Sequence, residues 1–481
     1  MTSLPHDLAV MLPELIVAMS GMALLLLGVV RGNERAMGFL SFLAIVAMAA
    51  AAWFVVRPLT PDIGAFGGAI VADGFARFAK ILILLGAALT LVMSKGYFVR
   101  EKIARFEFPV LVIFATLGML LMVSAASFLA LYMGLELQSL SLYVLAAFNR
   151  DSVRSSEAGL KYFVLGALSS GMLLYGISLI YGFTGTTEFV RVAAGIKQSG
   201  VSIGLIFGIV FLISGLAFKV AAVPFHMWTP DVYEGSPTPI TAFFAMAPKI
   251  AAMALFLRAI IVPFPDAIHQ WRQIIIAVSI LSMILGSVAA IGQTNIKRLM
   301  AYSSIGHMGY TLLGLAAGST KGVEGVLIYL TIYLVTNAGV FSCILAMKRN
   351  GQMVETIADL AGLARRQPRL ALALATFMLS LAGIPPLAGF FAKFYIFLAA
   401  IETGLVIPAV IGVLASVVGA YYYLRIVKIM YFDEPAPAFD GDVGVSLGAI
   451  VAGAGVFTLL FVVFAGPLLP LAAFGAKALV P

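Results

Sequence analysis

The sequence contains very few residues of the kinds that bind metals and redox cofactors. Its single cysteine, Cys343, excludes an internal disulfide framework and a cysteine-ligated iron–sulfur cluster. The four histidines are scattered without metal-ligand spacing (His6, His226, His269 and His307). No glycine-rich phosphate loop follows a strand pattern. We therefore expect the chain to bind no metal, redox cofactor or nucleotide of its own.

Charged residues are also scarce. They make up 11% of the 481 residues, where a soluble domain has about 25%, and hydrophobic residues reach 62% instead of roughly 45–50%. A soluble fold cannot cover that much apolar surface with so few charges. The net charge of +8 does not indicate nucleic acid as a partner, because the positive residues lie in short loops between apolar runs. The composition predicts an all-α polytopic membrane protein surrounded by lipids.

Apolar runs long enough to cross a bilayer recur along the whole chain. A spanning helix needs about 20 such residues. About fourteen transmembrane helices are predicted, at 8–30, 37–56, 71–94, 108–126, 127–148, 158–182, 202–228, 236–262, 272–293, 297–317, 321–347, 370–401, 404–431 and 444–473.

Loop lysines and arginines predict the orientation. Most of them follow odd-numbered spans, as in the 95–107 loop, and the positive-inside rule places that side in the cytoplasm. With fourteen spans, both termini are then expected outside. The alanine-rich, arginine-containing loops look bacterial, so the expected location is an inner (plasma) membrane with both termini on the periplasmic side. Arg77 and Lys80 begin span three and Lys161 begins span six, so all three are expected to snorkel to an interface.

Four ionisable residues are expected deep in the bilayer. Glu136 lies within span five, and Lys219, Lys249 and Lys393 lie within spans seven, eight and twelve. Each costs at least about 2.5–3.5 kcal/mol at mid-bilayer unless it is paired or meets water. A Glu–Lys pair that only holds helices together would explain one lysine and leave two. The pattern therefore favours a polar functional site at mid-membrane.

Two of these lysines lie close to helix breakers. Lys219 precedes Pro224, and Lys393 follows Pro385 and Pro386. Proline removes a backbone hydrogen bond, and in a bilayer the freed carbonyl is tolerated only within protein or beside water. The breaks fall in spans seven and twelve, five apart. This spacing predicts two inverted five-helix repeats, spans four to eight and nine to thirteen.

The predicted organisation therefore has four parts. Three transmembrane helices occupy 1–107, and the two repeats, each a half-channel, occupy 108–262 and 272–431. A C-terminal transmembrane helix occupies 432–481.

The deep residues suit proton translocation. Burial weakens the hold of a lysine on its proton, and a nearby carboxylate strengthens it. A pair of Glu136 and Lys219 could therefore act as a switch that passes a proton to Lys249 or to a water chain. His307 shares a helical face with Ser303 and suits a proton relay. The driving energy is expected from partner subunits or from another ion gradient.

Three segments resemble the antiporter-like subunits of respiratory complex I. They read PFHMWTPDVYEGSPTPITAF (224–243), IKRLMAYSSIGHMGY (296–310) and LAGIPPLAGFFAKF (381–394). The segment MGLELQSLSLYVL (133–145), the lysine at 393 and the lack of a long lateral helix resemble the N type, the bacterial counterpart of mitochondrial subunit 2.

The resemblance implies roles for the deep residues. Glu136 and Lys219 would form the switching pair, and Lys249 would be the central relay. Lys393 would end the second half-channel. Lys161 would substitute for a relay residue, and His307 would bridge the halves.

The resemblance also implies a large complex. In it, NADH reduces quinone through FMN and iron–sulfur clusters held by partner subunits, while this chain packs against an M-type neighbour and small membrane subunits. Two alternatives stay open: a cation/proton antiporter subunit and a purely structural membrane arm. One deep carboxylate against three deep lysines argues against a resident sodium site, because sodium prefers several oxygen ligands.

Overall fold

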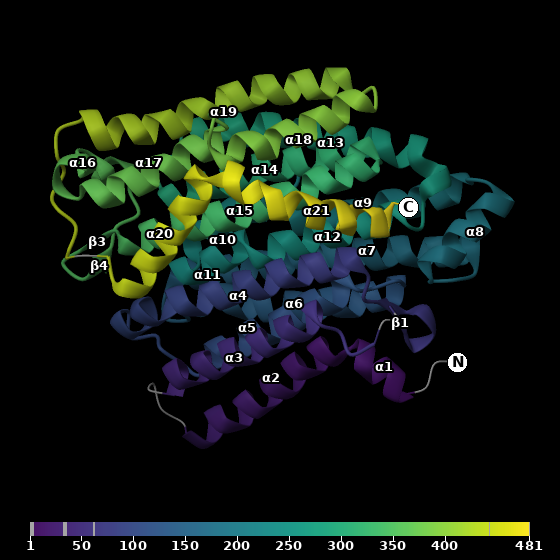
Figure 1. Ribbon diagram of the computed structural model, residues 1–481. Coiled ribbons are helices and arrows are strands. Elements are labelled where there is room, and N and C mark those ends of the chain that lie inside the picture. The colour runs from purple at the N-terminus through teal and green to yellow at the C-terminus, as the bar shows by residue number, and fades with distance from the viewer. Residues whose placement is uncertain (1–3, 32–35, 61–62, 442, 481) are drawn as a thin grey trace.

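The computed structural model describes residues 4–31, 36–60, 63–441 and 443–480. Nearly all of them form helices that run side by side along one direction (Figure 1). Eleven helical spans in the described ranges are long and apolar enough to cross a membrane, and three shorter apolar helices accompany them: α5 (Glu107–Val123), α17 (Pro368–Ala382) and α20 (Val445–Leu459). The prediction of an all-α polytopic membrane protein is confirmed.

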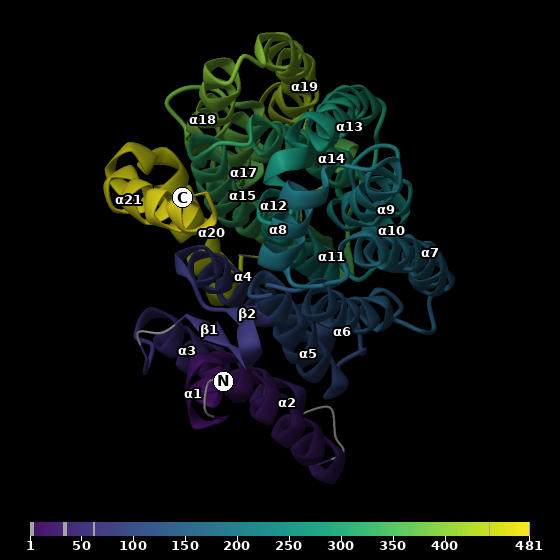
Figure 2. The same cartoon turned by 90° about the vertical axis from the view of Figure 1, so that its right-hand side faces the viewer.

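The first part of the chain forms a layer at one edge of the bundle, which Figure 2 shows end-on. A two-stranded hairpin with an intervening 3-10 turn connects its last two helices. The elements are α1 (Leu4–Val10), α2 (Leu12–Arg31), α3 (Ala36–Val56), β1 (Gly64–Ala65), η1 (Phe66–Gly68), β2 (Ile70–Val71) and α4 (Gly74–Arg100).

Two units of five spans follow. The seventh span of the chain is broken in the first unit, and the twelfth span is broken in the second. After α5 the first unit continues with α6 (Phe128–Ala146), α7 (Val153–Thr184), the short connecting α8 (Phe189–Ser199), α9 (Ile203–Val220), α10 (Trp228–Gly235), α11 (Thr238–Ala245) and α12 (Ala247–Ile261).

The second unit starts at the opposite end of the bundle, because five spans reverse the direction of the chain. Its elements are η2 (Pro265–Ala267), α13 (Ile268–Ile291), α14 (Ile296–Ala317), α15 (Thr320–Ala346), β3 (Lys348–Arg349), β4 (Gln352–Met353), η3 (Ile357–Leu360), α16 (Leu363–Arg366), α17, α18 (Ala388–Glu402) and α19 (Val406–Phe432). The chain then closes with α20 and α21 (Phe461–Leu479), which both pack along α15. The labelled N- and C-terminal ends lie on the same side of the bundle (Figure 1).

Both expected breaks are present. Helix α9 ends at Val220, where Ala221 takes a left-handed conformation with φ of 60°, and α17 ends at Ala382 with Gly383 left-handed. The expected span 202–228 was therefore too long as a helix. Span eight was expected to be continuous, but Met246 interrupts it, because Pro248 has no N–H to donate and starts a new helix instead.

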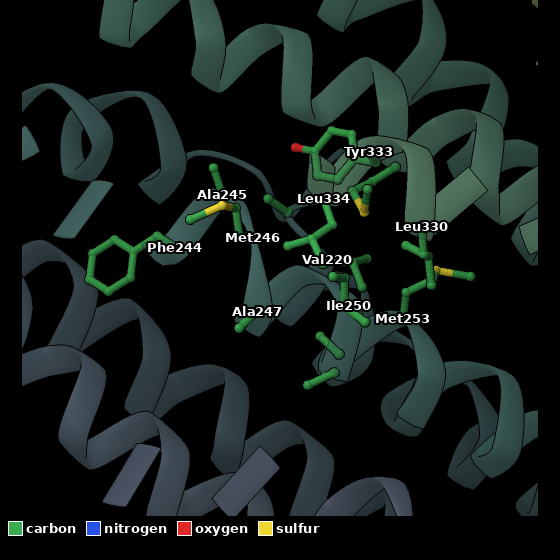
Figure 3. Packing of buried hydrophobic residues seen from close by; sticks show 14 of the residues in the cluster. Val220, Phe244, Ala245, Met246, Ala247, Ile250, Met253, Leu330, Tyr333 and Leu334 are labelled. Atoms are coloured by element: carbon green, nitrogen blue, oxygen red, sulfur yellow. The ribbon is translucent and has the colours of Figure 1, made fainter. Parts of the chain in front are cut away.

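Helices α11, α12 and α15 lie in the middle of the bundle. Their buried apolar side chains interlock around Met246, Ile250 and Leu334 (Figure 3). Because neighbouring helices surround this region (Figure 2), interrupted backbone here faces protein and not lipid.

Candidate functional site

The ammonium group of Lys219 lies among hydroxyl groups. Lys219 occupies the last turn of α9, where the partial negative charge of the helix end favours a cation. Its Nζ donates to Ser139 Oγ at 2.9 Å, and Tyr143 OH and Ser170 Oγ each lie 3.4 Å away. These groups come from α6 and α7, so three helices of the first unit meet at this lysine.

Glu136 lies on α6, one helical turn before Ser139. Its charge acts on Lys219 through space, but among the described residues no ion pair joins the two side chains. The Glu136 Oε1 atom is buried and has no hydrogen-bond partner in the described part of the chain. The structure thus places the two expected switch residues near each other without direct contact. Lys219 donates its hydrogen bond to Ser139 instead.

Lys249 lies at the break in span eight, as the third residue of α12. Only 1% of it is exposed. Its Nζ donates to the carbonyl oxygen of Val220 at 2.9 Å and lies 5.4 Å from the centre of the Trp228 ring. Val220 is the last residue of α9, so Lys249 binds a carbonyl that the break in span seven has freed.

Lys393 has a similar arrangement in the second unit. Its Nζ donates to the carbonyl oxygen of Ala382 at 2.9 Å and to Ser416 Oγ at 2.7 Å, and it lies 5.0 Å from the centre of the Tyr310 ring. Ala382 is the last residue of α17. In both units, a buried lysine therefore binds the carbonyl end of the first half of a broken span.

His307 on α14 is buried between two tyrosines. Its Nδ1 lies 2.5 Å from Tyr329 OH and its Nε2 lies 3.0 Å from Tyr423 OH. Tyr423 also bonds Ser303, the residue expected to share this helical face, at 2.5 Å. Each imidazole nitrogen thus has a hydroxyl partner that can pass a proton.

Two cavities of about 10 Å³ flank this histidine, and each is on the scale of the space that one water molecule needs. His307 and Lys393 both line the first cavity. The second extends from His307 towards Ser380 and Gly389, beside the break of span twelve.

Lys161 takes part in a surface network of ion pairs. Its Nζ lies 2.7 Å from Glu157 and 2.7 Å from Asp231, and Asp231 also accepts from Arg298 at 2.7 Å. Arg298 further contacts Glu234 at 3.0 Å. The lysine is 41% exposed, as its expected shallow position implies, and the network joins α7, α10 and α14.

Lys80 was expected to snorkel to an interface, and this expectation was wrong. Its Nζ forms an ion pair with Glu14 Oε1 at 2.5 Å, and both side chains are only 2% exposed. The pair joins α2 to α4. The sequence did carry a signal, because Glu14 stands inside the apolar run of span one, where an unpaired carboxylate would be costly.

Two further buried cations lie within predicted spans and were not singled out from the sequence. Arg258 of α12 binds both carboxylate oxygens of Asp73, at 2.7 and 2.9 Å. Lys297 of α14 binds Glu355 Oε1 at 2.6 Å. Nothing in the local sequence links these partners, since they are far apart in the chain and meet only in the fold.

A polar cavity of about 370 Å³ opens beside Lys297. Its lining includes Glu355, Ser236, Asn295 and Arg154, which lie at the end of the bundle that carries the arginine-rich loops. Across the described ranges, no three histidine, cysteine or acidic side chains cluster in a way that could hold a metal ion.

Comparisons with family models and with curated proteins identify the same family. The family described as NADH:quinone oxidoreductase/Mrp antiporter, transmembrane region, matches residues 125–419. The NADH-quinone oxidoreductase subunit N of Parvibaculum lavamentivorans is 60% identical over 474 residues, which cover 98% of this chain and 97% of that one. Subunit N of Azorhizobium caulinodans is 60% identical over 479 residues and the full length of both chains.

Solved structures give the same fold. A chain of respiratory complex I from Thermus thermophilus superposes with a TM-score of 0.80 at 36% identity, covering 96% of this chain and 99% of that chain. A chain of the Mrp complex from a Dietzia species has a TM-score of 0.83 at 23% identity and covers 98% and 97% of the two chains. The second similarity concerns the fold alone.

Proposed function

Because the chain belongs to the N-type family of antiporter-like subunits of bacterial NADH–quinone oxidoreductase, respiratory complex I, we propose that Lys219, Lys249 and Lys393 carry protons across the membrane. One observation supports this most directly. Lys249 and Lys393 are buried within the bundle and Lys219 is partly buried, and each donates to neutral hydroxyl or carbonyl oxygens. A lysine that only fixed the structure would be expected to face a carboxylate.

The first step of the proposed relay is an exchange of partners at Lys219. The ammonium group of Lys219 donates to Ser139, and Glu136 lies one helical turn before that serine on α6. Movement of the flexible lysine side chain towards the carboxylate would stabilise its proton, and return to the hydroxyl groups would favour release. The pair thus acts as a two-position switch.

Lys249 and Lys393 suit the following steps because their carbonyl partners accept a hydrogen bond in either protonation state. A charged lysine has three donors and a neutral one still has two, so proton loss leaves the anchoring bond in place. His307 connects the relay with Lys393 through the small cavity that both residues line. We assign Lys161 an outer role, since it is paired at the surface.

The arrangement in the membrane and the complex forms part of the proposal. We place the arginine-rich end and the polar cavity beside Lys297 in the cytoplasm, as the uptake side, and both termini in the periplasm. NADH, FMN, iron–sulfur clusters and quinone are assigned to partner subunits. Electron transfer there drives this chain, which packs against an M-type neighbour and small membrane subunits.

The relay is tested with Lys219→Ala and Glu136→Gln in native membranes. We expect normal complex content together with loss of most NADH–quinone turnover or of the proton gradient. Lys321→Ala is the matched control, because this exposed lysine pairs only with Glu402 in the described structure and should change neither readout. Loss of the complex in both variants would favour a purely structural role for the deep charges. Unchanged turnover and gradient would contradict the relay.

A further inference from the structure

A groove of about 570 Å³ runs between α5, α6 and α7 on the outer face of the first unit. Its walls are apolar and include Leu111, Val144, Leu160 and Phe163. Val144, Leu160 and Phe163 are 54%, 64% and 49% exposed, so the groove is open on the side that faces away from the bundle. In a bilayer, an apolar hollow at this position is filled by an apolar occupant.

Charged side chains gather at one end of the groove. Arg105 lies in the connection before α5, and Arg150 lies in the connection after α6. Within the described structure neither guanidinium takes part in an ion pair, whereas several other surface arginines do. Glu107 is exposed at the same end. These residues lie just outside the apolar spans, at the depth of lipid headgroups.

We propose that the groove is a binding site for one glycerophospholipid. The phosphate accepts hydrogen bonds from Arg105 and Arg150, and one acyl chain lies along Val144, Leu160 and Phe163. Arginine suits this role because its planar group pairs with two phosphate oxygens. An ethanolamine headgroup would add an ammonium group for Glu107.

The size of the groove favours a lipid chain over a helix of a partner subunit. A spanning helix is about 10 Å wide and about 30 Å long, which corresponds to roughly 2,400 Å³. Even counted with its open mouth, the empty space of the groove is about 1100 Å³, less than half of that volume. It therefore accepts an acyl chain along its length, while a helix could only cover its mouth.

The site gives the lipid a function, which rests on the relay proposed above. Tyr143 lines the groove, and its hydroxyl lies 3.4 Å from Lys219 Nζ. One tyrosine thus separates the groove from the first relay lysine. A bound acyl chain excludes water from this side, so that protons do not escape from Lys219 along the groove.

Occupancy is tested in the intact complex with a photoreactive p-benzoylphenylalanine in place of Leu160. After illumination and digestion, mass spectrometry of the labelled peptide identifies the neighbour. We expect a phospholipid adduct that falls about tenfold when Arg105→Gln and Arg150→Gln are combined, because both charge-assisted bonds are lost. Arg365→Gln with Arg366→Gln is the control and should leave the adduct unchanged. The same photoreactive residue at Val417, which is 66% exposed on α19, reports ordinary surrounding lipid.

Three results would overturn the site. They are a cross-link to a partner subunit, an adduct that the two groove arginines do not affect, and no adduct at 160 while position 417 is labelled.

The sealing role has a separate readout. The double arginine variant should retain NADH–quinone turnover and sustain a smaller proton gradient, and equal gradients would refute the seal. If the adduct behaves as expected but Lys219→Ala pumps normally, the lipid site stands and the relay fails.

Discussion

Among the described residues, six cations that are buried or partly buried within the bundle form two groups that differ in the charge of their partners. Three of them face carboxylates across helix–helix contacts: Lys80 with Glu14, Arg258 with Asp73 and Lys297 with Glu355. The other three face hydroxyl and carbonyl oxygens: Lys219, Lys249 and Lys393. A fixed ion pair holds its proton firmly, whereas a lysine among neutral oxygens can release it. We therefore expect the partner, more than the depth, to separate structural residues from those that carry protons.

At Lys393, charge and proton release can be tested separately. Lys393→Arg keeps a positive charge near Ser416 and Ala382, although arginine does not release its proton. Lys393→Ala removes both the charge and the bonds. We expect NADH-driven proton pumping to decrease from wild type to the arginine variant and further to the alanine variant at equal complex content. Equal pumping by the two variants would argue against a role for the charge.

The pair of Glu14 and Lys80 should behave as a structural ion pair. Glu14→Gln alone leaves a buried ammonium group without its counter-charge, which costs roughly 3–5 kcal/mol. We expect reduced complex content and a lower inactivation temperature of the solubilised complex. Combining Glu14→Gln with Lys80→Met removes both charges and should restore most of the loss. A double variant as unstable as the single one would refute the pairing.

At the scale of elements, prolines made the two principal breaks predictable. Pro224 and the pair Pro385 and Pro386 mark spans seven and twelve, and both spans are interrupted there. The break at Met246 escaped prediction because its proline lies two residues later, within a strongly apolar run. The deep lysines were identified individually from the energetic cost of a charge in lipid. The carbonyl partners of Lys249 and Lys393 could not be predicted, because a backbone carbonyl becomes free to accept a further hydrogen bond only where a helix ends.

Helix α10 is held to α7 and α14 by Asp231, which binds Lys161 and Arg298. Lys161→Ala leaves Arg298 in place, so α10 should remain attached. Exposed pairs also contribute little, about 0–1 kcal/mol. We therefore expect Lys161→Ala to retain most of the pumping, whereas Lys219→Ala loses most of it. Proton-gradient measurements at matched complex content show which variant pumps more. A larger loss in Lys161→Ala than in Lys219→Ala would contradict the shallow role of Lys161.

At the scale of the whole molecule, periodic apolar runs were sufficient to predict the fold class and the order of the spans. Each predicted span overlaps one helix or two consecutive helices, although the span at 202–228 extends beyond the end of α9 at Val220. Residues distant in sequence, such as Asp73 and Arg258, could not be paired, because the apolar pattern of a membrane helix hardly distinguishes its protein-facing side from its lipid-facing side. The contacts between the N-terminal layer and the two units therefore required the structure.

The orientation predicted from the loop charges can be tested by cysteine labelling. Lys95→Cys places an exposed thiol near the end of α4, and Lys197→Cys places one in α8. The three spans between these positions, α5, α6 and α7, put them at opposite ends of the bundle, while the native Cys343 is buried. A membrane-impermeant maleimide should label position 197 in right-side-out vesicles and position 95 only in inverted ones. Labelling of position 95 from the periplasmic side would reverse the proposed topology.

The carbonyl groups that hold Lys249 and Lys393 have a genetic consequence. Every amino acid carries the same backbone oxygen, so no codon change at Val220 or Ala382 deletes the acceptor itself. An alanine scan will therefore find the lysines and pass over the atoms that hold them. A backbone ester, introduced at the following residue, makes that carbonyl oxygen a weaker hydrogen-bond acceptor while keeping every side chain. It would therefore test the contribution of these carbonyl groups, which side-chain substitution cannot reach.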